Sequence, residues 1–248
     1  MPGWLQAAMW GALAGSALLI GAVMGYEMRL PQRLIATVTA FGSGVLISAL
    51  SFELMEKAFR QGGFDSTAAG FIGGAAAFTG ANWIVSRQGA KHRKRSGDHQ
   101  LSEGGSGLAV AIGALLDGIP ESIVIGLGLL SGKGVPVVAV AAIFLSHFPE
   151  GLSSATGMKR AKRSRAYVLG VWGSIAAASG IASLAGYVLF EGVSPEVVAA
   201  TTAVAAGAIL AMLADTMLPE AFETVHDFTG LITVAGFLTA FLIGKLGE

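Results

Sequence analysis

The chain has 248 residues, of which 53% are hydrophobic and 13% are charged, and its mean hydropathy is +0.67. A soluble domain has about twice this charged fraction, so the composition excludes an ordinary soluble protein and indicates a lipid bilayer as the natural solvent. The 16 basic and 16 acidic residues cancel, which gives no indication of nucleic acid binding, and the lack of cysteine excludes disulfides, thiolate metal sites and cysteine nucleophiles.

Eight apolar windows are each long enough to cross the ~30 Å hydrocarbon core of a bilayer as a helix. They cover about 4–26, 34–58, 68–87, 107–130, 135–158, 166–190, 195–217 and 229–246. The first window follows no basic segment and is too long for a signal-peptide core, so we expect it to be a retained helix. Ser194, Pro195 and Glu196 form a pattern typical of a helix start. The windows predict an all-α polytopic membrane protein with eight transmembrane helices in one domain, residues 1–248.

The basic residues orient this bundle. Most of the 16 lie in the connections after the first, third and fifth windows, and the positive-inside rule places such connections in the cytoplasm. Both termini are therefore predicted to be extracytoplasmic. The longest connection, a cytoplasmic loop of about 88–106, is interpreted as a solvated basic tether, with metal capture by His92 and His99 as the alternative.

Two segments of the sequence indicate an internal repeat. "GVLISALSFELMEKAF" at 44–59 and "GAILAMLADTMLPEAF" at 207–222 align without gaps and are identical at four of sixteen positions. Each places an acid at a similar depth, Glu53 in the first segment and Asp215 in the second. Because the two predicted helices run in opposite directions, the similarity indicates an inverted repeat, which is common among transporters.

Acidic residues interrupt the fourth and fifth windows. These windows contain "LLDGIPESIVIG" at 115–126 and "FLSHFPEGLSSA" at 144–155, where an ionised carboxylate costs at least ~3 kcal/mol. Asp117 and Glu121 share one helix face, and Ser146 and Glu150 share another with His147 beside them. Neither motif contains a lysine or arginine, so we interpret the missing positive charge as a bound divalent cation.

Each motif also contains a proline. Pro120 and Pro149 lack an N–H, which frees the carbonyl groups of Leu116 and Leu145 as additional ligands or pathway lining. The alternative is a pair of ordinary proline kinks whose carboxyl groups are protonated and hydrogen-bonded between helices.

The sequence lacks the residue patterns of an intramembrane enzyme. Ser146 and His147 are adjacent in a helix and point about 100° apart, so they cannot form a nucleophile–base pair. No H-E-x-x-H motif of a metalloprotease occurs in the sequence. We therefore predict that the protein is not an enzyme.

The two proline motifs, the eight windows and the histidine-containing loop resemble the ZIP family of divalent metal transporters. The helix 4 pattern of that family, H-N-x-P-E-G, is matched by Asp117, Gly118, Ile119, Pro120, Glu121 and Ser122. The helix 5 pattern, H-[ND]-x-P-E-G, is matched by Ser146, His147, Phe148, Pro149, Glu150 and Gly151. The resemblance implies a 3+2+3 inverted-repeat bundle with helices 4 and 5 at the centre and helices 2 and 7 lining the pathway.

The resemblance also implies a function. It predicts transport of divalent transition metals into the cytoplasm through a midplane site formed by Asp117, Glu121, His147, Glu150 and, more weakly, Ser146. Zn²⁺ is the expected substrate, with Fe²⁺, Mn²⁺ or Cd²⁺ as alternatives and no organic cofactor. One metal is favoured over two because Leu46 is not a ligand and helix 6 has no acid before Glu191.

Further expectations concern the pathway and its surroundings. Glu53 is a candidate entry ligand, and Asp215 and Glu220 are candidate exit ligands. We expect an integral protein of a bacterial inner (plasma) membrane whose partners are metal ions and lipid, with no nucleic acid. Small residues in helices 3 and 6 permit a homodimer. The alternative functions are a proton- or sodium-coupled carrier of another solute and a metal-dependent intramembrane enzyme.

Overall fold

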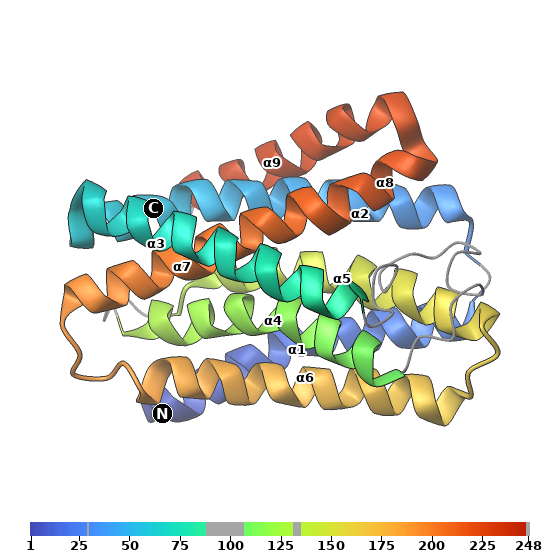
Figure 1. The fold of residues 1–248 in the computed structure, drawn as a ribbon, viewed down its shortest axis with the longest axis horizontal. Helices are drawn as coiled ribbons and strands as arrows, with labels where there is room; N and C mark the ends of the chain where they lie inside the picture. Colours follow the sequence, from blue (N-terminus) through green and yellow to red (C-terminus); the bar gives the residue numbers. More distant parts are fainter. Residues whose placement is uncertain (29, 88–106, 131–134, 247–248) are drawn as a thin grey trace.

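The computed structural model describes residues 1–28, 30–87, 107–130 and 135–246 (Figure 1). These ranges are almost entirely helical and contain no strand, which confirms the all-α prediction. The helices are α1 (Gly3–Glu27), α2 (Gln32–Ala49), α3 (Glu56–Val85), α4 (Gly107–Leu129), α5 (Val137–Arg160), α6 (Arg165–Val188), α7 (Pro195–Met212), α8 (Leu218–Val225) and α9 (Thr229–Leu246). Two π-helical segments, η1 (Leu50–Met55) and η4 (Leu213–Met217), continue α2 and α7, and a 3-10 turn, η5 (His226–Phe228), precedes α9.

Two of the expected connections are helical rather than loops. The windows predict a break between 58 and 68, but helical structure runs from Gln32 to Val85 and changes direction at Gly63, whose φ is 71° and ψ −177°. The second expected break, between 217 and 229, contains α8, and the chain reverses at His226, whose φ is 50°. A helix continues through weakly apolar sequence until one residue leaves helical φ and ψ, so hydropathy alone did not locate these corners.

Successive passes of the chain run in opposite directions along the long axis of the bundle (Figure 1). We call the end that contains the starts of α1 and α3 and the end of α9 the terminal end, and the opposite end, with the starts of α2, α6 and α9, the distal end.

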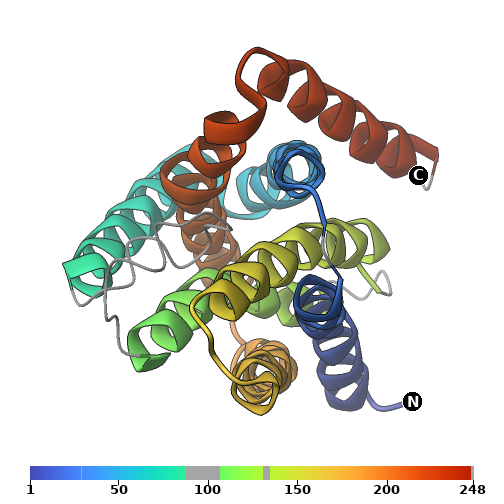
Figure 2. The same ribbon diagram turned by 90° about the vertical axis from the view of Figure 1, so that its right-hand side faces the viewer.

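Helices α4 and α5 lie at the centre. Helix α5 packs against α1 and α2, whereas α4 packs against α6 and α7; α1 and α6 also contact each other. Helix α3 packs along α7, and α9 packs along α2 at the periphery (Figure 2). The predicted motifs on α4 and α5 are therefore surrounded by other helices.

Glycine permits the closest of these contacts. A Cβ atom at Gly44 of α2 would overlap the carbonyl oxygen of Thr233 in α9, and one at Gly207 of α7 would overlap that of Phe71 in α3. Backbones approach this closely in membrane helices only where small residues face each other. These two glycines are the ones aligned at the start of the sequence repeat.

The correspondence between the two halves extends beyond the aligned glycines. Segment η1 begins at Leu50 and η4 at Leu213, and the positive-φ corners occur at Gly63 and His226. Both pairs have the same separation in sequence as the aligned glycines. The π-helical turn and the chain reversal therefore fall at equivalent positions of the two halves.

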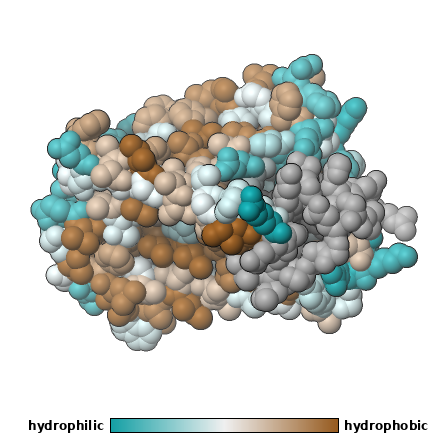
Figure 3. Space-filling view, viewed as in Figure 1, coloured by the Kyte–Doolittle hydropathy of each residue, from teal (hydrophilic) through white to brown (hydrophobic). Residues whose placement is uncertain are grey.

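The surface has the polarity of a membrane protein. Five helical segments of the described ranges are long and apolar enough to cross a membrane: Gly3–Glu27, Gln32–Val85, Val137–Arg160, Arg165–Val188 and Pro195–Leu246. Large apolar side chains are exposed, among them Ile72 at 68% and Leu231 at 69%. Figure 3 shows hydrophobic surface across the middle of one face and hydrophilic residues toward both ends. Eight crossings stay a prediction, because two of these segments contain a reversal and α4 is not among the five.

Candidate functional site

All five predicted ligands are buried between the central helices. Asp117 and Glu121 on α4, and Ser146, His147 and Glu150 on α5, are at most 6% exposed. Pro120 and Pro149 lie inside α4 and α5, and both helices continue through them. The sequence thus directs five polar side chains into the interior of an apolar bundle, where each requires a partner.

A close ion pair joins the two helices. His147 Nε2 lies 2.6 Å from Glu121 Oε2, and the two side chains are 1% and 2% exposed. The other ring nitrogen, Nδ1, lies 3.1 Å from the carbonyl oxygen of Ala14 in α1. A carbonyl oxygen only accepts a hydrogen bond, so Nδ1 carries a proton and Nε2 faces the carboxyl group.

This geometry requires a proton between His147 and Glu121. Two lone pairs at 2.6 Å would repel, so the proton resides either on Nε2 or on the carboxyl oxygen. Neither atom has a hydrogen-bond partner at a suitable angle, so the contact is a close approach of the two groups rather than an aligned hydrogen bond. The pair is electrically neutral in both protonation states, and neutrality explains how Glu121 is tolerated here.

The predicted ligands do not form one cluster in this structure. Among the residues that the structure describes, no group of three His, Asp or Glu side chains is placed to hold a metal ion. Asp117 lies one turn before Glu121, and Glu150 lies one turn after His147. A four-ligand site on one cation stays a prediction.

A glycine of α4, Gly118, lies beside the histidine. A Cβ atom at Gly118 would lie 3.9 Å from His147 Nε2 and 4.0 Å from Ser179 Oγ of α6. These distances are ordinary van der Waals contacts, so a small side chain fits at this position. Gly118 therefore leaves room for at least a methyl group next to Nε2.

The carbonyl freed by the second proline lies against another helix. A Cβ atom at Gly42 of α2 would be 3.3 Å from the carbonyl oxygen of Leu145 and 3.5 Å from Pro149 Cγ. The proline kink of α5 thus packs closely against α2 at a glycine.

The candidate exit residue Glu220 contacts the central helices. It is buried on α8, and its Oε1 accepts a short hydrogen bond from Ser153 Oγ of α5. Ser153 lies three residues after Glu150, toward the distal end. A second polar contact thus follows the predicted ligands along α5.

The two other pathway candidates have different surroundings. Glu53 lines a cavity of about 430 Å³ whose walls come from η1, α3, α4, α5 and α7. The wall residue Val124 is three residues after Glu121, so this cavity reaches to within one helical turn of the pair. Asp215 is exposed on η4. His92 and His99 lie outside the described residues.

Sequence reasoning missed the contribution of α1. The carbonyl of Ala14 orients His147, and a Cβ atom at Gly21 would overlap the carbonyl oxygen of Phe148 in the α5 motif. The signal was present as two G-x-x-x-G patterns, at 11–15 and 21–25, which are typical of closely packed membrane helices.

The molecule is thus an all-helical, membrane-type bundle with a buried histidine–glutamate pair at its centre. No protein-family model matches the chain, and no curated protein matches it. The resemblance to ZIP transporters therefore depends on the sequence motifs at 115–126 and 144–155 and stays a prediction.

Proposed function

We propose that the protein is a ZIP-like transporter that moves divalent transition-metal cations, with zinc as the main substrate, into the cytoplasm. The observation that most strongly supports this proposal is the buried contact between Glu121 and His147 at the interface of α4 and α5. Imidazole nitrogen and carboxylate oxygen are both zinc ligands, and ionisable groups within a membrane bundle mark ion pathways.

The proposed architecture is a 3+2+3 inverted repeat with eight crossings. The equivalent π-helical turns and corners support it, and so do the contacts of the central helices. A Cβ atom at Gly151 of α5 would overlap the carbonyl of Leu18 in α1, and one at Gly126 of α4 would overlap that of Ser183 in α6. Helices α1 and α5 thus pair in the same way as α6 and α4, which is the relation expected of inverted halves.

The proposed pathway runs from the terminal end to the distal end. Cations enter the cavity beside Glu53, reach the pair near Val124, and leave past Glu150 and Glu220. Asp215 is retained as a second exit candidate on η4.

Cation binding opens the pair. Two ligands at about 2.0–2.1 Å from a tetrahedral zinc ion lie roughly 3.3 Å apart, so His147 Nε2 and Glu121 Oε2 must separate by about 0.7 Å. The incoming zinc displaces the proton that the pair holds. Asp117 and Glu150 then supply further oxygen ligands.

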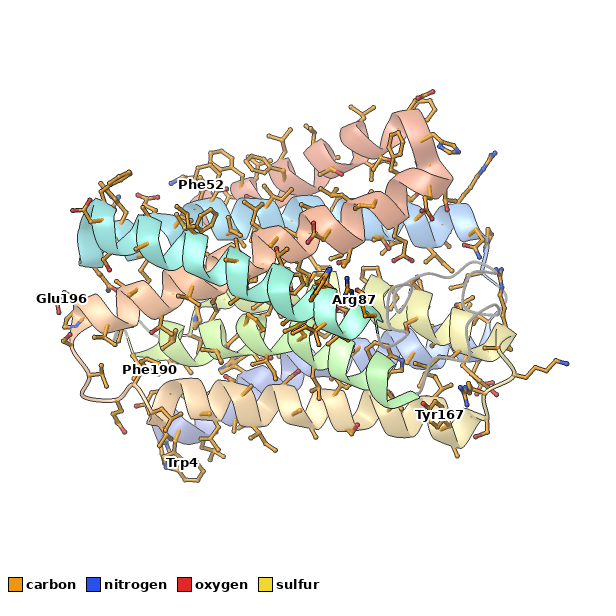
Figure 4. All side chains as sticks on the ribbon, in the orientation of Figure 1. Trp4, Phe52, Arg87, Tyr167, Phe190 and Glu196 are labelled. Carbon is orange, nitrogen blue, oxygen red and sulfur yellow. The ribbon has the colours of Figure 1, made fainter. Side chains whose placement is uncertain are left out.

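The proposed orientation places the distal end in the cytoplasm of a bacterial inner membrane. Lys159, Arg160, Lys162, Arg163 and Arg165 all lie at this end, in accordance with the positive-inside rule. In Figure 4, Tyr167 and Arg87 lie toward the distal end, whereas Trp4, Phe190 and Glu196 lie at the terminal end.

A homodimer stays compatible with the packing. Cβ atoms at Gly73 and Gly80 of α3, and at Gly170 and Gly173 of α6, would meet no atom of another element within 4 Å. These small-residue faces are therefore open to a second copy.

Zinc influx into vesicles that contain the purified protein tests the proposal. We expect Glu121→Gln and Glu150→Gln each to reduce influx at least about tenfold, because each removes a charged ligand. Asp65→Asn, at an exposed acid of the α3 corner, is the matched control and should leave influx unchanged. Wild-type influx in both ligand variants would refute the transport site.

The second candidate function is a proton- or sodium-coupled carrier of another solute. It is favoured by the close contact of two ionisable groups, His147 and Glu121, between which a proton can be exchanged. Proton or sodium flux in vesicles without zinc, abolished by Glu121→Gln, would establish it. Competition between Zn²⁺, Fe²⁺, Mn²⁺ and Cd²⁺ for influx would determine the preferred metal.

A further inference from the structure

The turn between α5 and α6 is densely basic. Lys159, Arg160, Lys162, Arg163 and Arg165 are all exposed, and we call residues 159–165 the basic turn. The like charges of so short a segment repel one another, and this positive potential attracts anions.

The basic turn is fixed to the end of α1. Tyr26 donates a hydrogen bond of 3.2 Å from its hydroxyl group to the carbonyl of Arg163, and Lys159 Nζ donates to the carbonyl of Tyr26. Arg165 Nε lies 2.6 Å from Glu27 Oε1. These contacts hold the cations in a defined arrangement instead of on a free loop.

Lys162 occupies a backbone position at which any side chain lowers the stability of the fold. Lys162 has a φ of 59°, and the N–H of Arg163 bonds the carbonyl of Met158 at 3.0 Å, which closes the end of α5 in a Schellman-type cap. Glycine is the favoured residue at this left-handed position, and a side chain there costs about 1 kcal/mol. A cation is therefore present where the backbone favours glycine.

Aromatic rings place these cations at the level of lipid headgroups. Lys159 Nζ lies 5.3 Å from the ring centre of Tyr26, and Arg163 Cζ lies 5.4 Å from that of Tyr167. Tyrosine side chains gather at the membrane–water interface, where phospholipid phosphates lie. Val23 and Met28, exposed on the same end of α1, offer apolar surface for the acyl chains.

We propose that the basic turn, together with Tyr26 and Tyr167, binds the phosphate group of an anionic phospholipid. Phosphate is the chemistry that an arginine–lysine cluster recognises, and basic clusters beside membrane helices attract anionic lipids. A lipid is assigned in preference to a free phosphate because apolar surface adjoins the cations. This site is independent of metal transport and depends only on insertion of the helices in a membrane.

Thermal unfolding of the full chain in neutral detergent tests the site, with phosphatidylglycerol, phosphatidylcholine or inorganic phosphate added separately. We expect phosphatidylglycerol alone to raise Tm, with a smaller response and weaker apparent binding in Lys162→Gln/Arg163→Gln. Each charge removed should weaken binding about fivefold, which is the factor given by about 1 kcal/mol per basic residue. The control, Arg33→Gln, removes an exposed charge at the same end outside the basic turn and should respond as the wild type.

Lys162→Gly separates lipid binding from a folding defect. It relieves the left-handed backbone and removes a charge, so Tm without lipid should rise while the shift caused by phosphatidylglycerol falls. Equal shifts in the site and control variants, or equal shifts with phosphatidylcholine, would overturn the proposal. A comparable shift with inorganic phosphate alone would overturn the assignment to a lipid.

Discussion

Two hairpins of the bundle share a backbone plan and differ in chemistry. The first consists of α2, η1 and α3, and the second of α7, η4, α8 and α9. Both have a glycine against a neighbouring carbonyl, a π-helical turn at the same place and a positive-φ corner. At aligned positions, however, the first hairpin has Lys57 and Gly63, where the second has Glu220 and His226.

The differences fall at the two ends of the proposed pathway. Lys57 lines the open cavity at the terminal end, whereas Glu220 is buried against Ser153 toward the distal end. The closely packed glycines therefore give the two hairpins the same backbone arrangement. The aligned side chains that differ, such as Lys57 and Glu220, give the two ends of the bundle different charges. A symmetric backbone with asymmetric charges can present different surroundings to a cation at entry and at exit.

Substitution of the closely packed glycines of the two hairpins should have the largest effect on stability. Gly44→Val and Gly207→Val each place side-chain atoms on a backbone carbonyl, so we expect each to lower the free energy of unfolding by about 3 kcal/mol or to prevent folding. Gly73→Val, at a glycine with open space around its Cβ position, should have little effect. Thermal unfolding in detergent measures the stability of all three variants. A Tm equal to that of the wild type in Gly44→Val or Gly207→Val would contradict the close packing.

Substitutions of the aligned charged residues, Lys57 and Glu220, should change zinc influx in opposite directions. Glu220→Gln should reduce zinc influx about tenfold, because it removes an anion from the exit. Lys57→Gln should raise influx at low zinc concentration about threefold, because it removes a positive charge from the entry cavity. Initial rates in vesicles measure both, and a change in the same direction for the two variants would contradict the assignment of entry and exit.

Exchanging the corner residues should have the smallest effect. His226→Gly should stabilise the protein by about 1 kcal/mol, because glycine adopts positive φ without strain. Gly63→His should destabilise it by a similar amount. Denaturation of the two variants in one detergent provides the comparison, and shifts of the same sign would show that backbone strain does not govern these corners.

The sequence predicted the hairpins better than it predicted their corners. Four identities were enough to align the glycines and the π-helical turns, because close packing fixes small residues at particular positions. The windows predicted a reversal between 217 and 229, but they did not identify His226 as its corner, since a histidine gives no signal for positive φ. Helix α7 begins at Pro195 as the sequence indicated, although Ser194 makes no capping hydrogen bond with its side chain.

The sequence indicated which polar residues of α4 and α5 lie in an apolar environment, but it did not indicate which of them contact each other. Because charged residues are rare in the apolar segments, the sequence indicates that Glu121 and His147 are polar residues in an apolar environment. Both side chains are buried in the structure. Their mutual contact was not foreseen, because a sequence shows which groups need a partner and not which partner each one takes. The contact of His147 with the carbonyl of Ala14 could not be predicted from the sequence either. Every residue has a carbonyl group, and only the folded structure shows which one lies beside the histidine.

The central claim is that the Glu121–His147 pair binds a divalent cation, and calorimetric titration of the purified protein with zinc in detergent tests it most directly. The account predicts saturable zinc binding in the wild type and in Asp65→Asn, and its loss in Glu121→Gln. Unchanged zinc binding in Glu121→Gln, or no zinc binding by the wild type, would contradict the claim.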